Sequence, residues 1–527
     1  MSASTNLDWH VCSRARLSRD PRFDGKFFIG VVGSGVYCRS ICPAPTANEK
    51  NVRYFPTAAA AAAAGFRPCL RCRPECSPGT PAWSGTSTTV ARALRLISES
   101  GLEDGGVEVL AEKLGVGSRH LRRLFLRHLG ATPMAVAQTR RLHFAKKLID
   151  ETLLPMNHVA VAAGFGSVRR FNAHIQQVYH RTPTQIRHLA RQTAVLGENH
   201  YSFRLRFRPP YHWPGMLAFL GPRCTPGVEI VEGGVYRRTI SYEGGHGYFE
   251  VSCNEERHTL VVRVQFGNPR ALYFIIERIR AMFDLNADWH AIVSSLRGDP
   301  LLARIVEAEP GLRLPGSWDG FELAVRAILG QQTTVRGATS LAGKIAAKFG
   351  RPFAPAPGLT HLFPTPEVLA KADLARMGLP ATRAAAIRAL ARAVCDRRIN
   401  FDGIVDSNAF LSHLCQIPGI GHWTAQYIAM RALAEPDAFP TGDRGISRAL
   451  NLTAENEIAK RSEPWRPWRA YAVMYLWRME SQSQHALKKS ANETSTTGQF
   501  VRAQLLGTES AHARKHGSGE QSVTTEA

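Results

Sequence analysis

The sequence lacks any long hydrophobic run. The apolar stretch at 58–64 is alanine only, and it is far shorter than the roughly eighteen apolar residues of a membrane-spanning helix. The chain also does not open with a charged segment followed by an apolar one, so we expect no secretory signal and no membrane partner. These absences favour a cytoplasmic protein.

Acidic residues are scarce beside basic ones. The 527 residues include 66 Lys and Arg against 43 Asp and Glu, which gives a formal net charge of +23 and a pI near 10.0. So large a positive charge argues against an ordinary metabolic enzyme and predicts a polyanionic partner. The length exceeds a single hydrophobic core, so we expect three or four domains.

Cysteine is too sparse for a disulfide scaffold, since there are ten in the whole chain. Four of them stand at metal-ligand spacing, as C-x3-C and C-x2-C: Cys38, Cys42, Cys69 and Cys72. Four thiolates in this pattern predict one tetrahedral zinc ion. Basic residues surround them, namely Arg39, Arg53, Arg67, Arg71 and Arg73, so an anionic ligand is expected nearby. The other six cysteines are interpreted as buried or free thiols.

A Pro, Gly, Ser and Thr cluster closes the zinc segment and separates residues 1–80 from a helical region at 81–192. That region repeats one pattern twice, in VEVLAEKLGVGSRHLRRLFLRHLGATP and MNHVAVAAGFGSVRRFNAHIQQVYHRTP. Each copy has a short helix, a Gly turn, a Ser that can cap the next helix, and an Arg-rich helix. The repetition predicts two helix-turn-helix units, with Arg119, Arg122, Arg169 and Arg170 on their second helices. The alternative is a pair of solvated basic faces.

The pair resembles the DNA-binding domain of AraC-type regulators, most closely in AAGFGSVRRFNAHIQQVYHRTPTQIR. Residues 1–80, with FFIGVVGSGVYCRSICPA and GFRPCLRCRP, are similar to the zinc domain of Ada-type alkylation-response proteins. This resemblance implies that Cys38 is both a zinc ligand and the acceptor of a methyl group from a DNA phosphotriester. It also implies phosphate contacts by Arg67 and Arg71, although Pro43 and Pro45 stand where this family commonly has arginines. Without the resemblance, a purely structural zinc site is the expectation.

The Pro-Cys-His-Arg acceptor motif of the alkylguanine methyltransferase domain is also missing. Instead, alternating strand patterns from about 198 to 285, beginning with LRFRPPYHWPGMLAFLGPR, predict a small antiparallel α+β domain. Helical periodicity follows over 286–482. Within it, LCQIPGIGHWTAQYIAMRAL predicts a helix-hairpin-helix. The N–H groups around Gly419, Gly421 and His422 would bind a DNA phosphate, and hairpin carbonyls would hold a monovalent cation.

Asp443 follows in FPTGDRGISRAL, in a Gly-flanked turn before a helix. A carboxylate after a helix-hairpin-helix is the catalytic group of DNA glycosylases of that superfamily, which the segment resembles. One carboxylate is enough to stabilise an oxocarbenium-like sugar when the leaving base is already cationic. The simpler interpretation of Asp443 is a helix N-cap. The two roles are compatible.

Two further absences narrow the glycosylase class. Trp423 stands where strand-cleaving members carry a lysine, and no cysteine follows Cys415 to hold an iron–sulfur cluster. Residues 198–480 instead resemble 3-methyladenine DNA glycosylase II, the AlkA type, in FELAVRAILGQQTTVRGA, PGIGHWTAQY, FPTGD and PWRAYAVMYLW.

This second resemblance implies a base pocket lined by Trp423, Tyr427 and Trp477, with Gln331 facing it. Gln332 replaces the leucine wedge of that type, and Trp465 and Trp468 are expected in the core.

The predicted fold is therefore multidomain and mainly α, with two smaller α+β parts. We predict a monofunctional DNA-3-methyladenine glycosylase fused to a methyl-accepting sensor and a promoter-binding activator. The protein is expected to be a monomer whose partners are double-stranded DNA, both alkylated and promoter DNA, and RNA polymerase. The alternative is a transcription regulator whose glycosylase-like half only binds DNA. Residues 483–527 are polar and predict a disordered tail.

Overall fold

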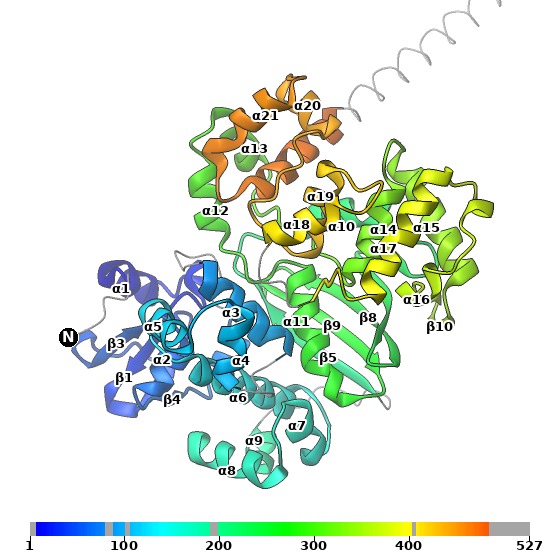
Figure 1. Ribbon diagram of the computed structural model, residues 1–527. Coiled ribbons are helices and arrows are strands. Elements are labelled where there is room, and N and C mark those ends of the chain that lie inside the picture. Colours follow the sequence, from blue (N-terminus) through cyan, green and yellow to red (C-terminus); the bar gives the residue numbers. More distant parts are fainter. Residues whose placement is uncertain (1–6, 79–87, 101–105, 190–198, 403–406, 484–527) are drawn as a thin grey trace, which may run out of the picture.

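The computed structural model describes residues 7–78, 88–100, 106–189, 199–402 and 407–483 (Figure 1). The tail predicted at 483–527 lies outside the described residues from 484 onward. Along the chain the structure passes from a zinc-binding segment to a helical region, a five-stranded sheet and a large helical domain. The predicted multidomain, mainly helical fold is confirmed.

The N-terminal segment is a four-stranded sheet in the order β3-β1-β2-β4, with β2 and β4 parallel and the other pairs antiparallel. Its alanine run forms a helix because Thr57 caps the amide of Ala60 and three alanines pack inward. The elements are α1 (Trp9–Leu17), β1 (Phe28–Val31), β2 (Val36–Cys38), β3 (Val52–Phe55), α2 (Ala58–Ala63) and β4 (Arg67–Pro68).

The helical region contains both predicted helix-turn-helix units. Ser167 caps α8 by accepting a hydrogen bond from the amide of Arg170, as expected. The expected cap by Ser118 is wrong, because Gly117 occupies the N-cap position and Ser118 begins α5. The elements are α3 (Thr88–Ser100), α4 (Gly106–Lys113), α5 (Ser118–Leu129), α6 (Pro133–Glu151), α7 (Met156–Ala162), α8 (Val168–Tyr179) and α9 (Pro183–Leu189).

The sheet domain is antiparallel throughout, in the order β5-β9-β8-β7-β6. Its segment WPGMLAFL is a helix, α10, and not part of a strand as predicted. A short continuous apolar run does not distinguish helix from buried strand by its period, and Pro214 is favourable in the first helical turn. The elements are β5 (His200–Arg206), α10 (Trp213–Leu220), β6 (Glu229–Glu232), β7 (Val235–Tyr242), β8 (Gly245–Asn254), β9 (Thr259–Phe266), η6 (Pro269–Ala271) and α11 (Leu272–Met282).

Within its described residues, 286–402 and 407–483, the remaining domain is helical apart from one two-stranded hairpin, β10 (Pro352–Ala356) and β11 (Leu359–His361), which the predicted all-helical stretch did not include. Trp465 and Trp468 are buried in its core, as expected. Its helices are α12 (Trp289–Leu296), α13 (Pro300–Ala308), α14 (Gly320–Leu329), α15 (Val335–Phe349), α16 (Pro366–Leu369), α17 (Ala381–Cys395), α18 (Ser407–Cys415), α19 (His422–Ala432), α20 (Arg444–Leu450) and α21 (Glu455–Ser462). A further helix covers 469–483.

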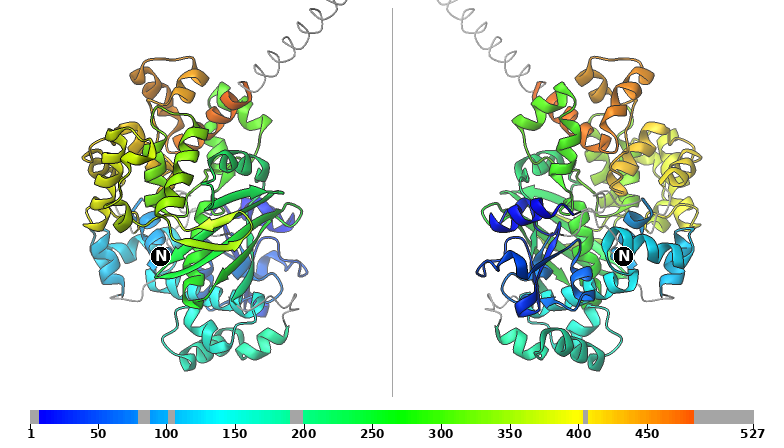
Figure 2. Two further views of the ribbon diagram at one scale, coloured as in Figure 1. Left: turned by 90° about the vertical axis from the view of Figure 1, so that its right-hand side faces the viewer. Right: turned by 90° about the vertical axis from the view of Figure 1, so that its left-hand side faces the viewer.

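The second helix-turn-helix unit and the sheet domain share one hydrophobic core. Phe144 on α6 meets Tyr273 on α11 edge to face, with ring centroids 5.0 Å apart, and α7 packs on η6. Figure 2 shows the second helix-turn-helix unit, in teal, below the green sheet, with the cyan helices of the first unit to the side. The regulator-like and repair-like parts are therefore packed together and are not separated by a free linker at this contact.

None of the helices in the described ranges combines the length and apolar character that crossing a membrane requires.

Candidate functional site

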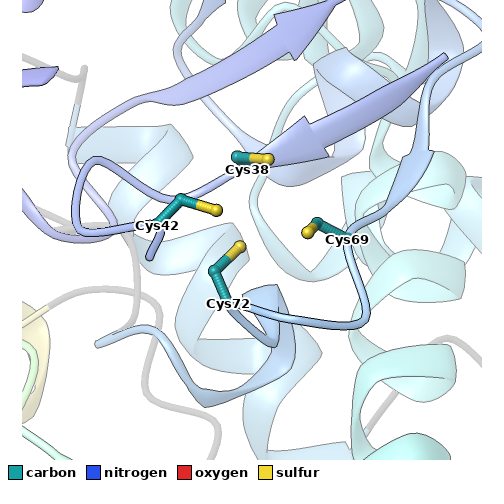
Figure 3. A group of neighbouring side chains, drawn as sticks. All are labelled: Cys38, Cys42, Cys69 and Cys72. Atoms are coloured by element: carbon teal, nitrogen blue, oxygen red, sulfur yellow. The ribbon is translucent and has the colours of Figure 1, made fainter. Parts of the chain in front are cut away.

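The four predicted zinc ligands meet at one point. Cys38 ends β2, Cys42 follows in the next turn, and Cys69 and Cys72 come directly after β4. Their sulfur atoms all lie within 4.8 Å of one another and point toward a common centre (Figure 3). A tetrahedral ion with Zn–S bonds of 2.3 Å places its sulfurs about 3.8 Å apart, so the cluster fits one Zn²⁺. Cys38 is 7% exposed, whereas Cys42 is more open to solvent.

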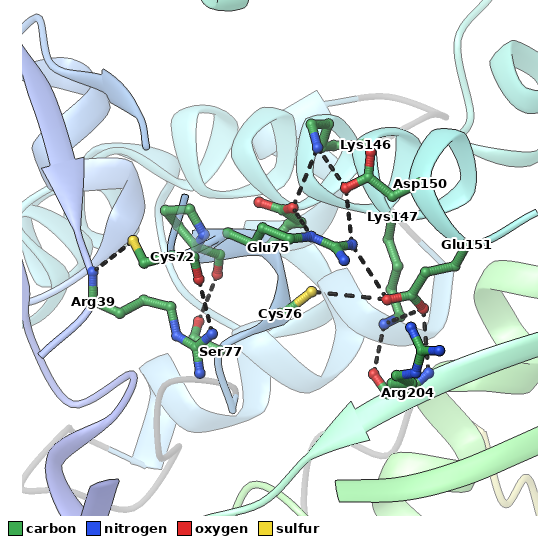
Figure 4. A network of polar contacts seen from close by, with 12 residues as sticks. Arg39, Cys72, Glu75, Cys76, Ser77, Lys146, Lys147, Asp150, Glu151 and Arg204 are labelled. Carbon is green, nitrogen blue, oxygen red and sulfur yellow. Dashed lines mark hydrogen bonds and ion pairs between the residues drawn. The ribbon is translucent and has the colours of Figure 1, made fainter. Parts of the chain in front are cut away.

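The arginines near this site fall into two groups. Arg39 is buried and forms an ion pair with Asp24. Arg73 forms ion pairs with Glu75, Asp150 and Glu151, and these three carboxylates belong to the polar network in Figure 4. The charges of these two arginines are neutralised within the protein. Contrary to the expectation from the sequence, they do not help to attract an external anion. Arg53 and Arg71 are exposed and Arg67 is half-buried. The latter three remain accessible to a phosphate.

The recognition-type helices present their arginines to solvent. Arg119 and Arg122 on α5 and Arg169 and Arg170 on α8 are all exposed. Arg122 also pairs with Glu108 on α4 at 2.7 Å. An exposed pair of this kind contributes little stability, so Arg122 can exchange the carboxylate for a phosphate at small cost.

The predicted helix-hairpin-helix is formed by α18 and α19. Ile417 and Ile420 are buried, and Gly419 turns the chain with a φ of 88°. Gly421 is the N-cap of α19, and it makes no side-chain capping bond. The first amides of α19, from His422, therefore point outward without a capping side chain, and such amides suit a phosphate oxygen.

Asp443 is held by four donors at the start of α20. Its Oδ1 accepts from the amides of Gly445 and Ile446 at 2.9 and 3.0 Å, and from the indole of Trp477 at 2.8 Å. Its Oδ2 accepts from the indole of Trp423 at 3.2 Å. The N-cap interpretation is thus correct in geometry. Oδ2 carries only one of the four bonds and keeps the greater free acceptor capacity.

Aromatic rings surround this carboxylate. Trp423 stacks on Tyr427 with ring centroids 5.7 Å apart and an interplanar angle of 15°, and Trp477 lies 6.2 Å from Tyr427. These three residues and Asp443 line one cavity of about 630 Å³. The cavity lies between the sheet domain and the helical domain, so residues that are far apart in the chain form its walls.

Comparison with known proteins accounts for each part of this arrangement. Residues 11–75 match the metal binding domain of Ada, and residues 110–188 match a helix-turn-helix domain. Residues 202–319 match the AlkA N-terminal domain, and residues 325–463 match the HhH-GPD superfamily of base excision DNA repair proteins.

A "probable bifunctional transcriptional activator/DNA repair enzyme AlkA" of Mycobacterium tuberculosis is 40% identical over 479 residues, which are 89% of this chain and 96% of the relative. The chain belongs to this family of bifunctional activators and DNA repair enzymes.

Two relatives from Escherichia coli cover the two halves of this family's architecture. DNA-3-methyladenine glycosylase 2 is 33% identical over 281 residues, which are 53% of this chain and 97% of the relative. The bifunctional transcriptional activator/DNA repair enzyme Ada is 34% identical over 182 residues, 34% of this chain and 49% of the relative. The chain therefore joins an Ada-like sensor and regulator to an AlkA-type glycosylase, with one zinc site.

Gln331 is placed differently from the prediction. It is not among the residues that line the cavity; its side-chain amide donates to the carbonyl of Gly419 at 2.8 Å and to Thr424 Oγ1 at 3.0 Å. The side-chain amide of Gln331 is directed toward the hairpin and not into the cavity, because Gly419 and Thr424 accept its two hydrogen bonds. Gln332 is exposed and has a φ of 51°.

The sequence did not reveal several residues around the pocket. Phe219 of α10 stacks near Trp477, with centroids 6.2 Å apart at 15°, and Arg431 bonds to the Tyr427 hydroxyl. Arg326 of α14 also lines the cavity. The strand interpretation of 213–220 concealed Phe219. Arg431 could have been found from the sequence in one way: it lies four residues after Tyr427, and residues at this spacing lie on the same face of a helix.

Proposed function

We propose that Asp443 catalyses hydrolysis of the N-glycosidic bond of alkylated bases such as 3-methyladenine, and that Cys38 accepts a methyl group from DNA phosphotriesters. The observation that supports the first role most strongly is the convergence of two indole N–H groups on one carboxylate inside an aromatic cavity. A helix N-cap without a function has no need of such a setting.

The carboxylate would act on the sugar. When the bond between C1′ and the base nitrogen breaks, its electron pair leaves with the base and the sugar becomes oxocarbenium-like. The three donors on Oδ1 hold the Asp443 carboxylate in place, while Oδ2 faces the developing charge and orients a water. Trp423, Tyr427 and Trp477 stack on the flipped base, which favours cationic alkylpurines.

The sensor would transfer a methyl group once. A zinc ion bound to the four cysteines keeps their sulfurs as thiolates at neutral pH. Cys38 Sγ attacks the methyl carbon, the carbon–oxygen bond breaks, and the phosphate oxygen keeps the electron pair. The product thioether has lost one negative charge, so the domain should bind DNA phosphates more tightly.

The DNA-binding surfaces follow from exposure and charge. Arg67 and Arg71 would contact phosphates beside the zinc site, Arg119, Arg122, Arg169 and Arg170 would contact promoter DNA, and Gly419, Gly421 and His422 would bind a phosphate at the hairpin. We also propose that carbonyl groups of the hairpin bind a monovalent cation and that the protein contacts RNA polymerase. The protein would act as a monomer in the cytoplasm.

The glycosylase assignment is tested by release of 3-methyladenine from methylated duplex DNA. Asp443→Asn should reduce release by several orders of magnitude, while the affinity for an undamaged duplex stays within about threefold, because the amide keeps the shape of the side chain. Equal release by the variant would refute the role of Asp443. Binding without release by the unchanged protein would favour the alternative, a regulator with a DNA-binding clamp.

The sensor assignment is tested with DNA that carries labelled methyl phosphotriesters. Cys38→Ser should eliminate methyl transfer to the protein. Cys42→Ser is the matched control, because Cys42 is a ligand of the same site and is more exposed than Cys38. Transfer that persists in the Cys38 variant and disappears in the Cys42 variant would assign the acceptor to Cys42.

A further inference from the structure

One turn of the sensor, residues 24–26, lies between the zinc site and the glycosylase half of the chain. Asp24 contacts both sides. Its carboxylate forms an ion pair with Arg39, in which Oδ1 accepts from Nε at 2.8 Å. Its carbonyl oxygen accepts from Nε of Arg208, in the sheet domain, at 2.9 Å. All three residues are at most 3% exposed, so the sensor and the sheet domain meet through buried charges.

Arg39 joins the two halves of the zinc site. It directly follows the ligand Cys38 in the chain, and its backbone amide donates to the sulfur of Cys72 at 3.4 Å (Figure 4). Its Nη1 also donates to the carbonyl oxygen of Cys72 at 2.9 Å. The ion pair with Asp24 fixes the guanidinium that makes this second bond. Arg39 and Asp24 therefore surround the ligand set, and such outer groups orient the ligands of a metal and raise its affinity.

The glycosylase half contacts the same turn at two further points. Gly25 has a φ of 75°, and a Cβ there would lie 2.1 Å from the carbonyl oxygen of Pro78 and 3.2 Å from Nη2 of Arg208, so no side chain fits between the turn and this arginine. Lys26 forms an ion pair with Asp288 at 2.6 Å. Asp288 is the N-cap of α12 in the helical domain. The turn is thus in contact with both domains of the glycosylase half.

The burial of these charges makes the conformation of the turn depend on both sides. Arg208 also donates from Nη1 to the carbonyl oxygen of Asn286 at 3.0 Å. A buried charged group that loses a partner is strongly destabilised, so the turn keeps this conformation only while its partners are in place. A shift at Arg208 displaces Asp24, and through Asp24 it displaces Arg39 and its bonds to Cys72.

We propose that the glycosylase half raises the zinc affinity of the sensor, because Arg208 and Asp288 hold the turn that orients Arg39. Zinc binding and docking of the sensor on the glycosylase are then linked, and each strengthens the other by the same factor. A change at the metal site therefore changes the contact with α12, and the repair half becomes a structural part of the sensor.

The zinc affinity of the reduced, full-length protein is measured by competition for Zn²⁺ with a chromophoric chelator. Arg208→Lys keeps the charge but loses the planar fork that reaches two carbonyl groups, and Asp288→Asn keeps an N-cap oxygen but loses the charge that pairs with Lys26. Each variant should raise the dissociation constant for Zn²⁺ by about tenfold, the lower end of the effect of outer groups. Arg22→Gln is the matched control, because Arg22 is 54% exposed and pairs with Asp20 of its own segment. This variant should change the affinity by less than about twofold.

Hydrogen exchange tests the reverse direction. Removal of zinc from the unchanged protein should speed exchange of the Ala291 amide, which donates to Asp288 at 3.3 Å, by about the same tenfold factor. The acceleration should be smaller in Lys26→Met, where the contact with α12 is already weakened. Unchanged zinc affinity in both Arg208→Lys and Asp288→Asn would overturn the inference, and so would exchange at α12 that does not respond to zinc. If Arg208→Lys does not fold, Asp288→Asn and the exchange of the unchanged protein still decide.

Discussion

At the scale of single residues, Asp443 shows how one side chain can serve structure and chemistry together. It caps α20 through Oδ1 and keeps Oδ2 open to the cavity. The sequence indicated both roles by different routes: Asp is a preferred N-cap residue before a helix, and the catalytic role came from the resemblance of this segment to DNA glycosylases. The two tryptophans that hold it lie 20 residues before it and 34 residues after it, and only the tertiary structure shows their bonds.

Trp477→Phe should weaken catalysis without removing the pocket wall. The phenyl ring keeps part of the stacking surface but loses the N–H that donates to Asp443 at 2.8 Å. A lost hydrogen bond to a charged group costs about 1.5–3 kcal/mol, so release should slow by about tenfold to a hundredfold. Single-turnover release measures this. An unchanged rate would mean that the indole does not orient the carboxylate.

His143 should make the contact between the sensor and α6 sensitive to acid. Its Nε2 lies 2.8 Å from the Tyr37 hydroxyl oxygen. Burial lowers the pKa of His143 to about 4. The negative charge of Glu75 raises this pKa and the positive charge of Lys146 lowers it, but both effects are smaller than that of burial. Between pH 6.5 and 4 the unfolded state binds more protons at His143 than the folded state does. The contribution of neutral His143 to the free energy of unfolding is therefore complete above pH 6.5 and is lost as the pH falls toward 4.

Protonation of His143 should lower the free energy of unfolding by at most about 3 kcal/mol. It is measured as the free energy of unfolding against pH. His143→Gln is the comparison, because it retains the zinc ligands and any acid sensitivity of theirs. Parallel curves for the two proteins would contradict the assignment to His143.

At the scale of elements, the hairpin depends on Gly419 for its shape. With a φ of 88°, an alanine there would be strained, and its Cβ would lie 2.8 Å from the Cβ of Ala386 on α17. Gly419→Ala should lower the free energy of unfolding by about 2 kcal/mol. Gly421→Ala is the matched control for stability, since a Cβ there meets nothing within 4 Å. Thermal unfolding of both variants decides the point.

Helices and strands were predictable from the sequence where their apolar residues recur with a clear period or where a capping residue marks an end. Elements without either signal were not predictable. Each second helix of the helix-turn-helix units places an apolar residue inward every three or four positions, as Phe171, Ile175 and Tyr179 do on α8. The run at 213–220 is apolar nearly throughout, so its period carries no information about helix or strand. The hairpin β10–β11 lies on the surface beside α15 and was too short to interrupt the helical pattern.

At the scale of the whole molecule, the regulator and the glycosylase are joined by a common core and by polar contacts. Lys147 on α6 donates to the carbonyl of Arg204 on β5 at 2.7 Å, and Glu151 accepts from the amide of Arg204 at 3.2 Å. On the sensor side, Arg208 of the sheet domain donates to the carbonyl of Asp24 at 2.9 Å, and Lys26 pairs with Asp288, the N-cap of α12 in the helical domain. The sheet domain thus contacts both N-terminal parts.

Truncation should reveal this dependence. A fragment of residues 1–192 would expose the face of the second helix-turn-helix unit that packs on Tyr273 and η6, so it should bind a hydrophobic dye and melt at a lower temperature than the full chain. A fragment of residues 1–285 retains the sheet domain and should protect that unit. Dye binding and thermal melting of both fragments provide the test, and equal behaviour would contradict a shared core.

The sequence alone determined the zinc ligand set, the paired helix-turn-helix units, the helix-hairpin-helix and the position of Asp443, because each depends on spacing within a short segment. Only the tertiary structure decided that Arg39 and Arg73 pair internally, that Gln331 binds the hairpin, that Arg431 lines the base pocket, and that Phe219 stacks on the pocket residue Trp477. The common core of regulator and glycosylase belongs to this second group as well. The physical reason is that ion pairing and apolar burial join residues far apart in the chain, and spacing along one segment carries no record of those partners.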